Sequence, residues 1–322
     1  MSAPNPDNNT IGCFAEPIIF VAGPTASGKT ELAIQIANKF GCEIIGVDSM
    51  QVYKYMDIGS AKPSKSELAQ APHHLIGYVN PDEQYNASRF VDDCRQVISE
   101  IRKRNKIPLL VGGTGLYFRA LEFGIFNQPE IDAKIRLKLT QEIADLGAQD
   151  LHNELSKVDP ESARRIHPND SYRILRALEI FRSTGKAWSE YIMEHNKENN
   201  VARGNKRLLK IGVNRNREEL YQRINKRVGL MIKMGLIDEV KKLISRGYPV
   251  TLSSMQSLGY RHIAAFLSGE WEWDKTVELL ARDTRRYAKR QSTWFRKDKE
   301  MHWFYPEEKQ QLFSTISEFL AQ

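Results

Sequence analysis

Residues 23–30 carry the most informative chemistry in the sequence. They read GPTASGKT and match the phosphate-binding pattern G-x-x-x-x-G-K-[ST] at every fixed position. In such a loop the glycines let successive backbone N–H groups point at one anion, Lys29 adds a positive charge, and Thr30 offers a hydroxyl to Mg²⁺. The segment therefore predicts a site for a diphosphate or triphosphate. The candidate phosphate-binding residues are Gly23, Pro24, Thr25, Ala26, Ser27, Gly28, Lys29 and Thr30.

The flanking sequence supports this interpretation. Residues 18–22 (IIFVA) are β-branched and apolar, which indicates a buried strand, and residues 29–40 repeat apolar side chains at the spacing of a core-facing helix. A strand, a glycine loop and a helix form the setting of a true phosphate loop. The alternative, a chance glycine turn, does not account for this context.

A second strand-like run, residues 43–47, ends at Asp48. Ligands of a parallel sheet collect outside the carboxyl ends of its strands, so we expect Asp48 beside the phosphate loop, as a base or a metal ligand. A third run, residues 109–111, leads into Gly112 and Gly113 without a terminal acid. Many ATP-hydrolysing proteins hold Mg²⁺ with an aspartate after such a strand, and its absence weakens an ATPase interpretation.

The chain resumes this pattern near its middle. Residues 208–213 predict a strand and residues 217–234 a helix, on which Arg223 and Arg227 lie inside or beside the apolar stripe. An arginine that faces inward needs an anion. The alternative is a long side chain lying over a surface patch, and the sequence leaves both open.

Residues 130–200 predict helices without strands, and the polar residues 196–205 predict a loop. We therefore expect an α/β protein with a P-loop NTPase-like parallel sheet core and a helical insertion domain. The predicted divisions are a disordered tail (1–16), the first part of the core (17–128), the insertion (129–200) and the second part of the core (201–322).

Composition excludes several classes of protein. With 41% hydrophobic and 27% charged residues, the chain resembles an ordinary globular enzyme, and no apolar run is long enough to span a membrane. The start of the chain is too polar for a signal peptide. Three widely spaced cysteines argue against a disulfide framework and a zinc site. We expect a cytoplasmic protein without membrane contact.

Positive charge is concentrated in residues 201–300, which hold 23 lysines and arginines against 11 aspartates and glutamates. Drawn as a helix, residues 277–297 place Arg286, Lys289 and Arg290 on one side and an aromatic-rich packing side opposite. A basic stripe of this kind suits the phosphates of a nucleic acid. The alternative is an ordinary solvated face.

Seven segments in order resemble the tRNA dimethylallyltransferase family of the bacterial type. They are GPTASGKT (23–30), VDSMQVYKYMDIGSAKP (47–63), APHHL (71–75), PLLVGGTGLYFRAL (108–121), RIHPNDSYRILRALEIF (165–181), SLGYRH (257–262) and RYAKRQSTWFR (286–296). The resemblance implies transfer of a dimethylallyl group from dimethylallyl diphosphate to N6 of the adenosine just 3′ of the tRNA anticodon, releasing diphosphate. It also implies Mg²⁺ as cofactor, and we expect a monomer.

By the same resemblance, Asp48 accepts a proton from N6, Thr25 holds the reacting groups, and Arg223 binds the diphosphate. The implied tRNA-binding residues are Asp48, Ser49, Met50, Gln51, Thr114, Arg136, Tyr172, Arg173, Ile174, Leu175, Arg176, Gln256, Ser257, Leu258, Gly259, Tyr260, Arg261, Arg286, Lys289 and Arg290. Two departures from the family pattern, Gly115 and Tyr172, concern packing or tRNA contact. They leave the reaction unaffected.

Three other functions compete with this one. A phosphate-loop kinase for a small molecule would need a lid and an adenine pocket for ATP. A non-enzymatic RNA-binding module would leave the phosphate loop and Asp48 without a role. Transfer of the same allyl group to free AMP or ADP would leave the helical insertion and the basic helix without a partner.

Overall fold

The computed structural model describes residues 14–125, 132–201 and 206–322. The chain forms two compact units, one built from Met1–Phe123 with Asn205–Gln322 and the other from Gly124–Gly204. The insertion predicted for residues 129–200 falls within the second unit. Its predicted start lies outside the described residues.

A parallel sheet of six strands forms the centre of the first unit, in the order β3-β2-β4-β1-β5-β6. The strands are β1 (Ile18–Ala22), β2 (Cys42–Val47), β3 (His73–His74), β4 (Ile107–Gly112), β5 (Leu208–Val213) and β6 (His302–Phe304). Strand β1 lies between β4 and β5, with Ile19 opposite Leu109 and Leu209. Because all strands are parallel, the loops that follow them meet at one edge. The α/β prediction is confirmed.

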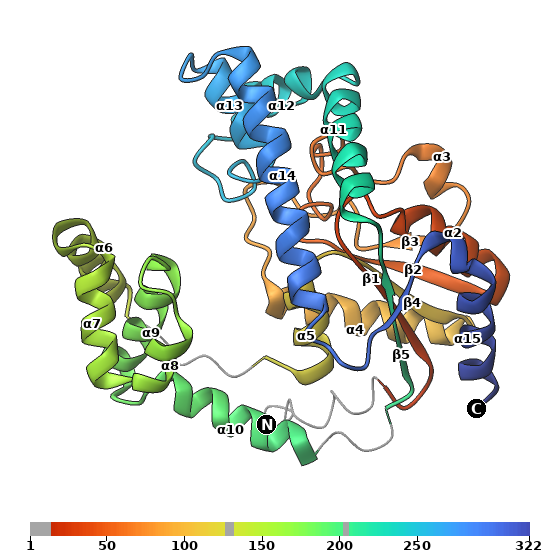
Figure 1. Cartoon of the computed structure of the whole chain (residues 1–322), viewed down its shortest axis with the longest axis horizontal. Coiled ribbons are helices and arrows are strands. Elements are labelled where there is room, and N and C mark those ends of the chain that lie inside the picture. Colours follow the sequence, from red (N-terminus) through yellow and green to blue (C-terminus); the bar gives the residue numbers. More distant parts are fainter. Residues whose placement is uncertain (1–13, 126–131, 202–205) are drawn as a thin grey trace. The chain divides into compact units, whose positions relative to one another are not determined.

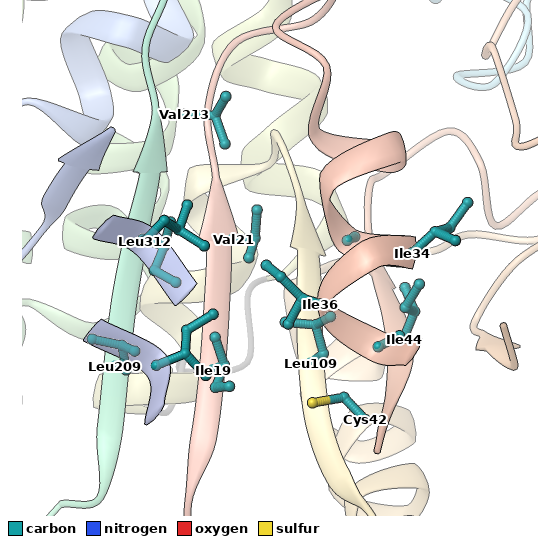
Figure 2. Packing of buried hydrophobic residues seen from close by; sticks show 14 of the residues in the cluster. Ile19, Val21, Ile34, Ile36, Cys42, Ile44, Leu109, Leu209, Val213 and Leu312 are labelled. Carbon is teal, nitrogen blue, oxygen red and sulfur yellow. The ribbon is translucent and has the colours of Figure 1, made fainter. Parts of the chain in front are cut away.

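Helices cover both faces of this sheet (Figure 1). The helices of the first unit are α2 (Lys29–Phe40), α3 (Lys65–Leu68), α4 (Ala87–Lys103), α5 (Gly115–Phe123), α11 (Arg217–Lys233), α12 (Leu236–Ser245), α13 (Tyr260–Leu267), α14 (Trp273–Phe295), the 3₁₀ turn η1 (Pro306–Glu308) and α15 (Lys309–Ala321). Alternate residues of β1 face opposite sides. Ile19 and Val21 pack with Ile36 of α2 and Leu312 of α15 (Figure 2), whereas Phe20 packs on Phe118 of α5, 4.8 Å between ring centroids.

Helices α11 to α14 lie at the carboxyl edge of the sheet (Figure 1). Helix α14 packs against α11 and α13, and also against α5. The helix predicted for residues 277–297 is confirmed, although it begins about one turn earlier, after Glu272. This arrangement places α14 across the loops that carry the predicted site.

The second unit is helical. Its helices are α6 (Ala133–Leu146), α7 (Ala148–Val158), α8 (Pro160–Arg165), α9 (Ser171–Thr184) and α10 (Trp188–Val201). Leu139, Leu155 and Ile174 belong to one fully buried core. The loop predicted for residues 196–205 is wrong as far as Val201, because α10 continues there.

The start of the described chain also differs from the prediction. Phe14 is buried with its ring 6.3 Å from that of Phe20, and its carbonyl accepts a hydrogen bond from the Arg207 N–H. The predicted tail (1–16) is therefore too long, because an aromatic side chain gains from burial in the core. Residues 1–13 lie outside the described residues. Within the part of the chain that the structure describes, no helix is long and apolar enough to cross a membrane.

Candidate active site at the carboxyl edge of the sheet

A cavity of about 350 Å³ lies at the carboxyl edge of the sheet. The loops that follow β1, β2 and β4 reach it, as do α11 and α14. The predicted site residues that line it are Thr25, Ala26, Gly28, Lys29, Thr30, Asp48, Met50, Gln51, Arg223, Ser257, Leu258, Gly259 and Tyr260. Residues far apart in the sequence are thus brought to one concave site, the usual form of a small-molecule site.

The phosphate loop adopts a backbone that its glycines make possible. Gly28 has φ 97°, in the left-handed region that L side chains rarely adopt, and a Cβ on Gly23 would lie 2.8 Å from the Val213 carbonyl oxygen. Ala26 is also left-handed, at φ 64°. The Lys29 ammonium donates a hydrogen bond to the Pro24 carbonyl at 2.6 Å. The loop is therefore curled around the position where an anion would bind.

Two arginines from the second half of the chain contact this loop. Arg215 Nε donates to the Ser27 carbonyl at 2.7 Å, and Arg223 Nε donates to the Ala26 carbonyl at 2.8 Å. These contacts cover carbonyl oxygens that would otherwise repel an anion. Arg227, one turn beyond Arg223 on α11, lines the cavity itself. The structure thus brings Arg223 and Arg227, the two arginines singled out on this helix, to the loop and the cavity, and it adds Arg215.

Asp48 begins the loop after β2. Its Oδ1 accepts hydrogen bonds from the N–H groups of Met50 at 2.8 Å and Gln51 at 3.2 Å, which fix the carboxylate relative to the sheet. Burial raises the pKa of Asp48, while these two N–H groups, and then Lys29, oppose the rise. A carboxylate with a raised pKa is a stronger base, so the site holds a candidate general base beside the phosphate loop.

The pKa of Lys29 is lowered to about 7, chiefly by burial and then by the nearby Arg227 guanidinium, while the Asp48 carboxylate opposes both. An ammonium crowded by other cations and shielded from water loses its proton easily. The arrangement is therefore short of negative charge, as expected of a site built for a polyanionic ligand.

Sequence reasoning missed two side chains of α14 that reach the site. Gln291 is buried, accepts a hydrogen bond from the Thr25 N–H at 2.8 Å and donates one to the Gly113 carbonyl at 2.9 Å. Tyr287 also lines the cavity; burial and then the Asp48 carboxylate raise its pKa. The signal in the sequence was a polar amide on the packing side of a helix, because a buried amide needs partners.

The predicted residue Thr114 lies between these elements. Its hydroxyl oxygen accepts a hydrogen bond from the Ser49 N–H at 3.1 Å, and its side chain also hydrogen-bonds to Tyr287. Thr114 and Ser49 therefore hold the Asp48 turn against the loop that follows β4.

Tyr260 corrects a prediction. It was expected to contact tRNA, but its side chain is fully buried and its hydroxyl donates to Glu239 at 2.7 Å. The same carboxylate accepts hydrogen bonds from the N–H groups of Asp57, Ile58 and Gly59 at 2.8–3.0 Å. A Cβ on Gly59 would lie 2.5 Å from the Tyr260 ring. Tyr260 thus packs beneath the loop that carries Gly59 to the cavity.

Other predicted tRNA-binding residues divide by exposure. On α9, Tyr172 and Arg173 are exposed, but Ile174 is fully buried in the helical core, Leu175 packs on that core, and Arg176 pairs with Glu179. The prediction is wrong for Ile174, because residues on one side of an amphipathic helix face its core. Arg136 pairs with Glu179 at 2.6 Å.

In the segment before α13, Gln256 is exposed and its side-chain amide donates a hydrogen bond to the Val250 carbonyl. The Ser257 hydroxyl donates to the Ser254 carbonyl. Leu258 and Gly259 line the cavity, and Arg261 pairs with Asp283 at 2.8 Å. The segment therefore forms part of the cavity wall.

The basic stripe of α14 is exposed at Arg286, Lys289 and Arg290. The Asp283 carboxylate, next to this stripe, forms ion pairs with several side chains. It lies 3.1 Å from Arg282, 3.3 Å from His262 and 3.8 Å from Arg286. Although burial opposes it, hydrogen bonds from Arg282 and His262 hold the pKa of Asp283 below its usual value. Asp283 partly neutralises the start of the stripe, while Lys289 and Arg290 lie beyond it.

The donor set suits Mg²⁺. The Thr30 hydroxyl and the Asp48 carboxylate line the same cavity, and Mg²⁺ prefers oxygen ligands. Across residues 14–125, 132–201 and 206–322 no group of three or more histidines, cysteines or carboxylates could form an all-protein cage. A metal here would therefore complete its ligands with phosphate oxygens and water.

The chain matches known proteins over nearly its whole length. The family model described as IPP transferase matches residues 51–298, and that described as isopentenyl transferase matches residues 17–76. A tRNA dimethylallyltransferase of Desulfotalea psychrophila is 48% identical over 95% of this chain and 96% of its own length.

Solved structures agree with these matches. The tRNA isopentenylpyrophosphate transferase of Bacillus halodurans is 37% identical, with a TM-score of 0.70 over 95% of this chain and 97% of that one. A eukaryotic dimethylallyltransferase, solved acting on tRNA, is 30% identical, with a TM-score of 0.70 over 90% of this chain and 74% of that one. From the family match, the identity and the shared fold, we conclude that the chain belongs to the IPP transferase family.

Proposed function

We propose that this protein is a tRNA dimethylallyltransferase, which transfers the dimethylallyl group of dimethylallyl diphosphate to N6 of the adenosine just 3′ of the anticodon. The observation that carries the proposal is the meeting, in one cavity, of a phosphate loop with an arginine-rich wall and a buried carboxylate, Asp48. The name of the Desulfotalea psychrophila relative supports the same activity.

Each group has a distinct task in this reaction. The amides of the phosphate loop, Lys29 and Arg223 hold the diphosphate and stabilise the charge that develops as the bond between the allyl carbon and oxygen breaks. The adenine N6 forms the new bond to that carbon, and Asp48 accepts the proton that N6 loses. Thr25, which lines the cavity on the loop itself, helps to hold the two reactants together.

We propose Mg²⁺ as the cofactor, held by Thr30, with Asp48 nearby. When bound, it supplies positive charge to the departing diphosphate. The protein's own contribution is to bring Thr30 and Asp48 to the same cavity.

The tRNA needs a surface of its own, because the target adenine is stacked in the anticodon loop and must be flipped out to reach the cavity. We assign the backbone contacts to Arg286, Lys289 and Arg290 of α14, which are exposed. In the helical unit, the exposed Tyr172 and Arg173 are the candidates. We further propose that the enzyme acts as a monomer in the cytoplasm, where its tRNA substrate is found.

The test is direct. The protein is incubated with tRNA and dimethylallyl diphosphate in the presence of Mg²⁺, and the digested nucleosides are separated by mass spectrometry. We expect N6-isopentenyladenosine in tRNA and none when free AMP replaces it. Prenylated AMP, or unmodified tRNA in the first reaction, would reject the proposal.

A further inference from the structure

Gln291 occupies an unusual position on α14. Ala288, three residues before it, and Phe295, four residues after it, lie on the same side of the helix and are buried. Gln291 is itself only 6% exposed. The opposite side of the helix carries the exposed Lys289 and Arg290. Burying an amide costs free energy unless both of its ends find partners, so its contacts carry information about its task.

Both ends of the Gln291 amide contact loops that are distant in sequence. Oε1 accepts from the Thr25 N–H at 2.8 Å, and Nε2 donates to the Gly113 carbonyl at 2.9 Å. A Cβ on Gly113 would lie 2.1 Å from Nε2, so the approach requires glycine at that position. The side chain therefore joins the phosphate loop to the loop that follows β4.

The second loop leads to the base. Thr114 follows Gly113, and its hydroxyl accepts from the Ser49 N–H, adjacent to Asp48. Two hydrogen bonds of Gln291 and one of Thr114, joined by the peptide bond between Gly113 and Thr114, thus connect Thr25 to the turn that holds Asp48. The Thr25 N–H, on the phosphate loop, is the donor at one end of this connection.

We propose that Gln291 is the positioning residue that sets the distance between the phosphate loop and Asp48. The inference rests on the proposed function, in which the loop holds the leaving group and Asp48 receives the proton. A displacement of about 1 Å between reacting groups can cost about 10²-fold in rate, so a single bridging amide has a large effect on turnover. It has little effect on tRNA affinity, since the exposed stripe is unchanged.

The test compares Gln291→Met with Gln311→Met. Methionine matches glutamine in length but offers neither strong donor nor strong acceptor, and Gln311 is exposed on α15. We expect the Thr25 amide of Gln291→Met to exchange its hydrogen about tenfold faster than in the wild type. We expect kcat to fall about 10²-fold with an unchanged KM for tRNA. The Gln311 variant should match the wild type in all three measurements.

Gln291→Glu separates the two ends of the amide. Its carboxylate still accepts from the Thr25 N–H but no longer donates to the Gly113 carbonyl, so Thr25 should stay protected while kcat falls. This variant also decides the matter should Gln291→Met fail to fold: wild-type kcat in Gln291→Glu would overturn the inference. In folded Gln291→Met, unchanged exchange at Thr25 or unchanged kcat would overturn it as well.

The proposed function and this inference fail in different ways. Exchange at Thr25 and binding of inorganic diphosphate require neither tRNA nor a prenyl product, and we expect Gln291→Met to weaken diphosphate binding. A wild-type protein that forms no isopentenyladenosine rejects the proposed function. Wild-type exchange at Thr25 and wild-type diphosphate binding in Gln291→Met reject the role of Gln291 as a positioning residue.

Discussion

The lowered pKa of Lys29 predicts how affinity for the diphosphate depends on pH. In the free protein, burial and Arg227 bring the pKa of this ammonium to about 7. A bound diphosphate places negative charge against it and raises its pKa, so Lys29 is protonated in the complex. Binding at or above neutral pH therefore requires uptake of a proton.

The magnitude follows from the fraction of free protein that carries the charge. That fraction is about nine-tenths at pH 6, one-half at pH 7 and one-tenth at pH 8, and the apparent affinity scales with it. The contribution of Lys29 to diphosphate affinity should thus be nearly flat below pH 6 and fall about tenfold per unit above pH 8. The sign is fixed, because a group whose pKa rises on binding favours the complex at low pH.

Isothermal titration calorimetry measures both quantities. Titrations with inorganic diphosphate at fixed Mg²⁺, in buffers of different ionisation enthalpy, report the number of protons taken up: about one-half at pH 7 and nearly one at pH 8. Lys29→Met removes this contribution and leaves the ionisation of the ligand itself unchanged. Identical pH slopes and proton uptake in the two proteins would show that Lys29 is already charged in the free protein.

Three further changes test other parts of the site. Asp48→Asn should lower kcat by ~10²–10⁴-fold without weakening tRNA binding, because it removes the base and leaves the basic surface intact. The pair Arg286→Ala/Arg290→Ala should reduce the slope of log affinity for tRNA against log salt by roughly one unit per lost phosphate contact, as measured by fluorescence titration. In Glu239→Gln an NH₂ group replaces one carboxylate oxygen, so two of the groups that now donate to Glu239 lose their acceptor. Each unsatisfied donor costs roughly 1–3 kcal/mol, so the melting temperature measured by calorimetry should fall.

Each of these predictions has an outcome that contradicts it. Wild-type turnover in Asp48→Asn would remove Asp48 from the mechanism. Equal salt slopes would make the stripe of α14 an ordinary solvated face. For Glu239, the exposed Glu278→Gln on α14 is the matched control, and equal melting temperatures for the two variants would show that the loop at Gly59 is held by other contacts.

Local sequence determined the core of the site. The strands at residues 18–22 and 208–213 and the helix at residues 29–40 were predicted with the bounds that the structure has. The phosphate loop and Asp48 follow strands directly, so the position of each depends on its neighbours in sequence. The parallel arrangement then brings the strand ends together without further information.

Only the tertiary structure decided which side chains complete and hold the site. Gln291 reaches Thr25 across 266 residues, and Glu239 reaches Gly59 across 180. Helical periodicity places both on a packing side or a surface but does not identify the facing loop. The same limit explains the wrong prediction at Tyr260, since a motif shared with a family marks a position without showing whether its side chain faces RNA or the core. Burial and partners depend on how distant elements pack, and packing is a property of the whole fold.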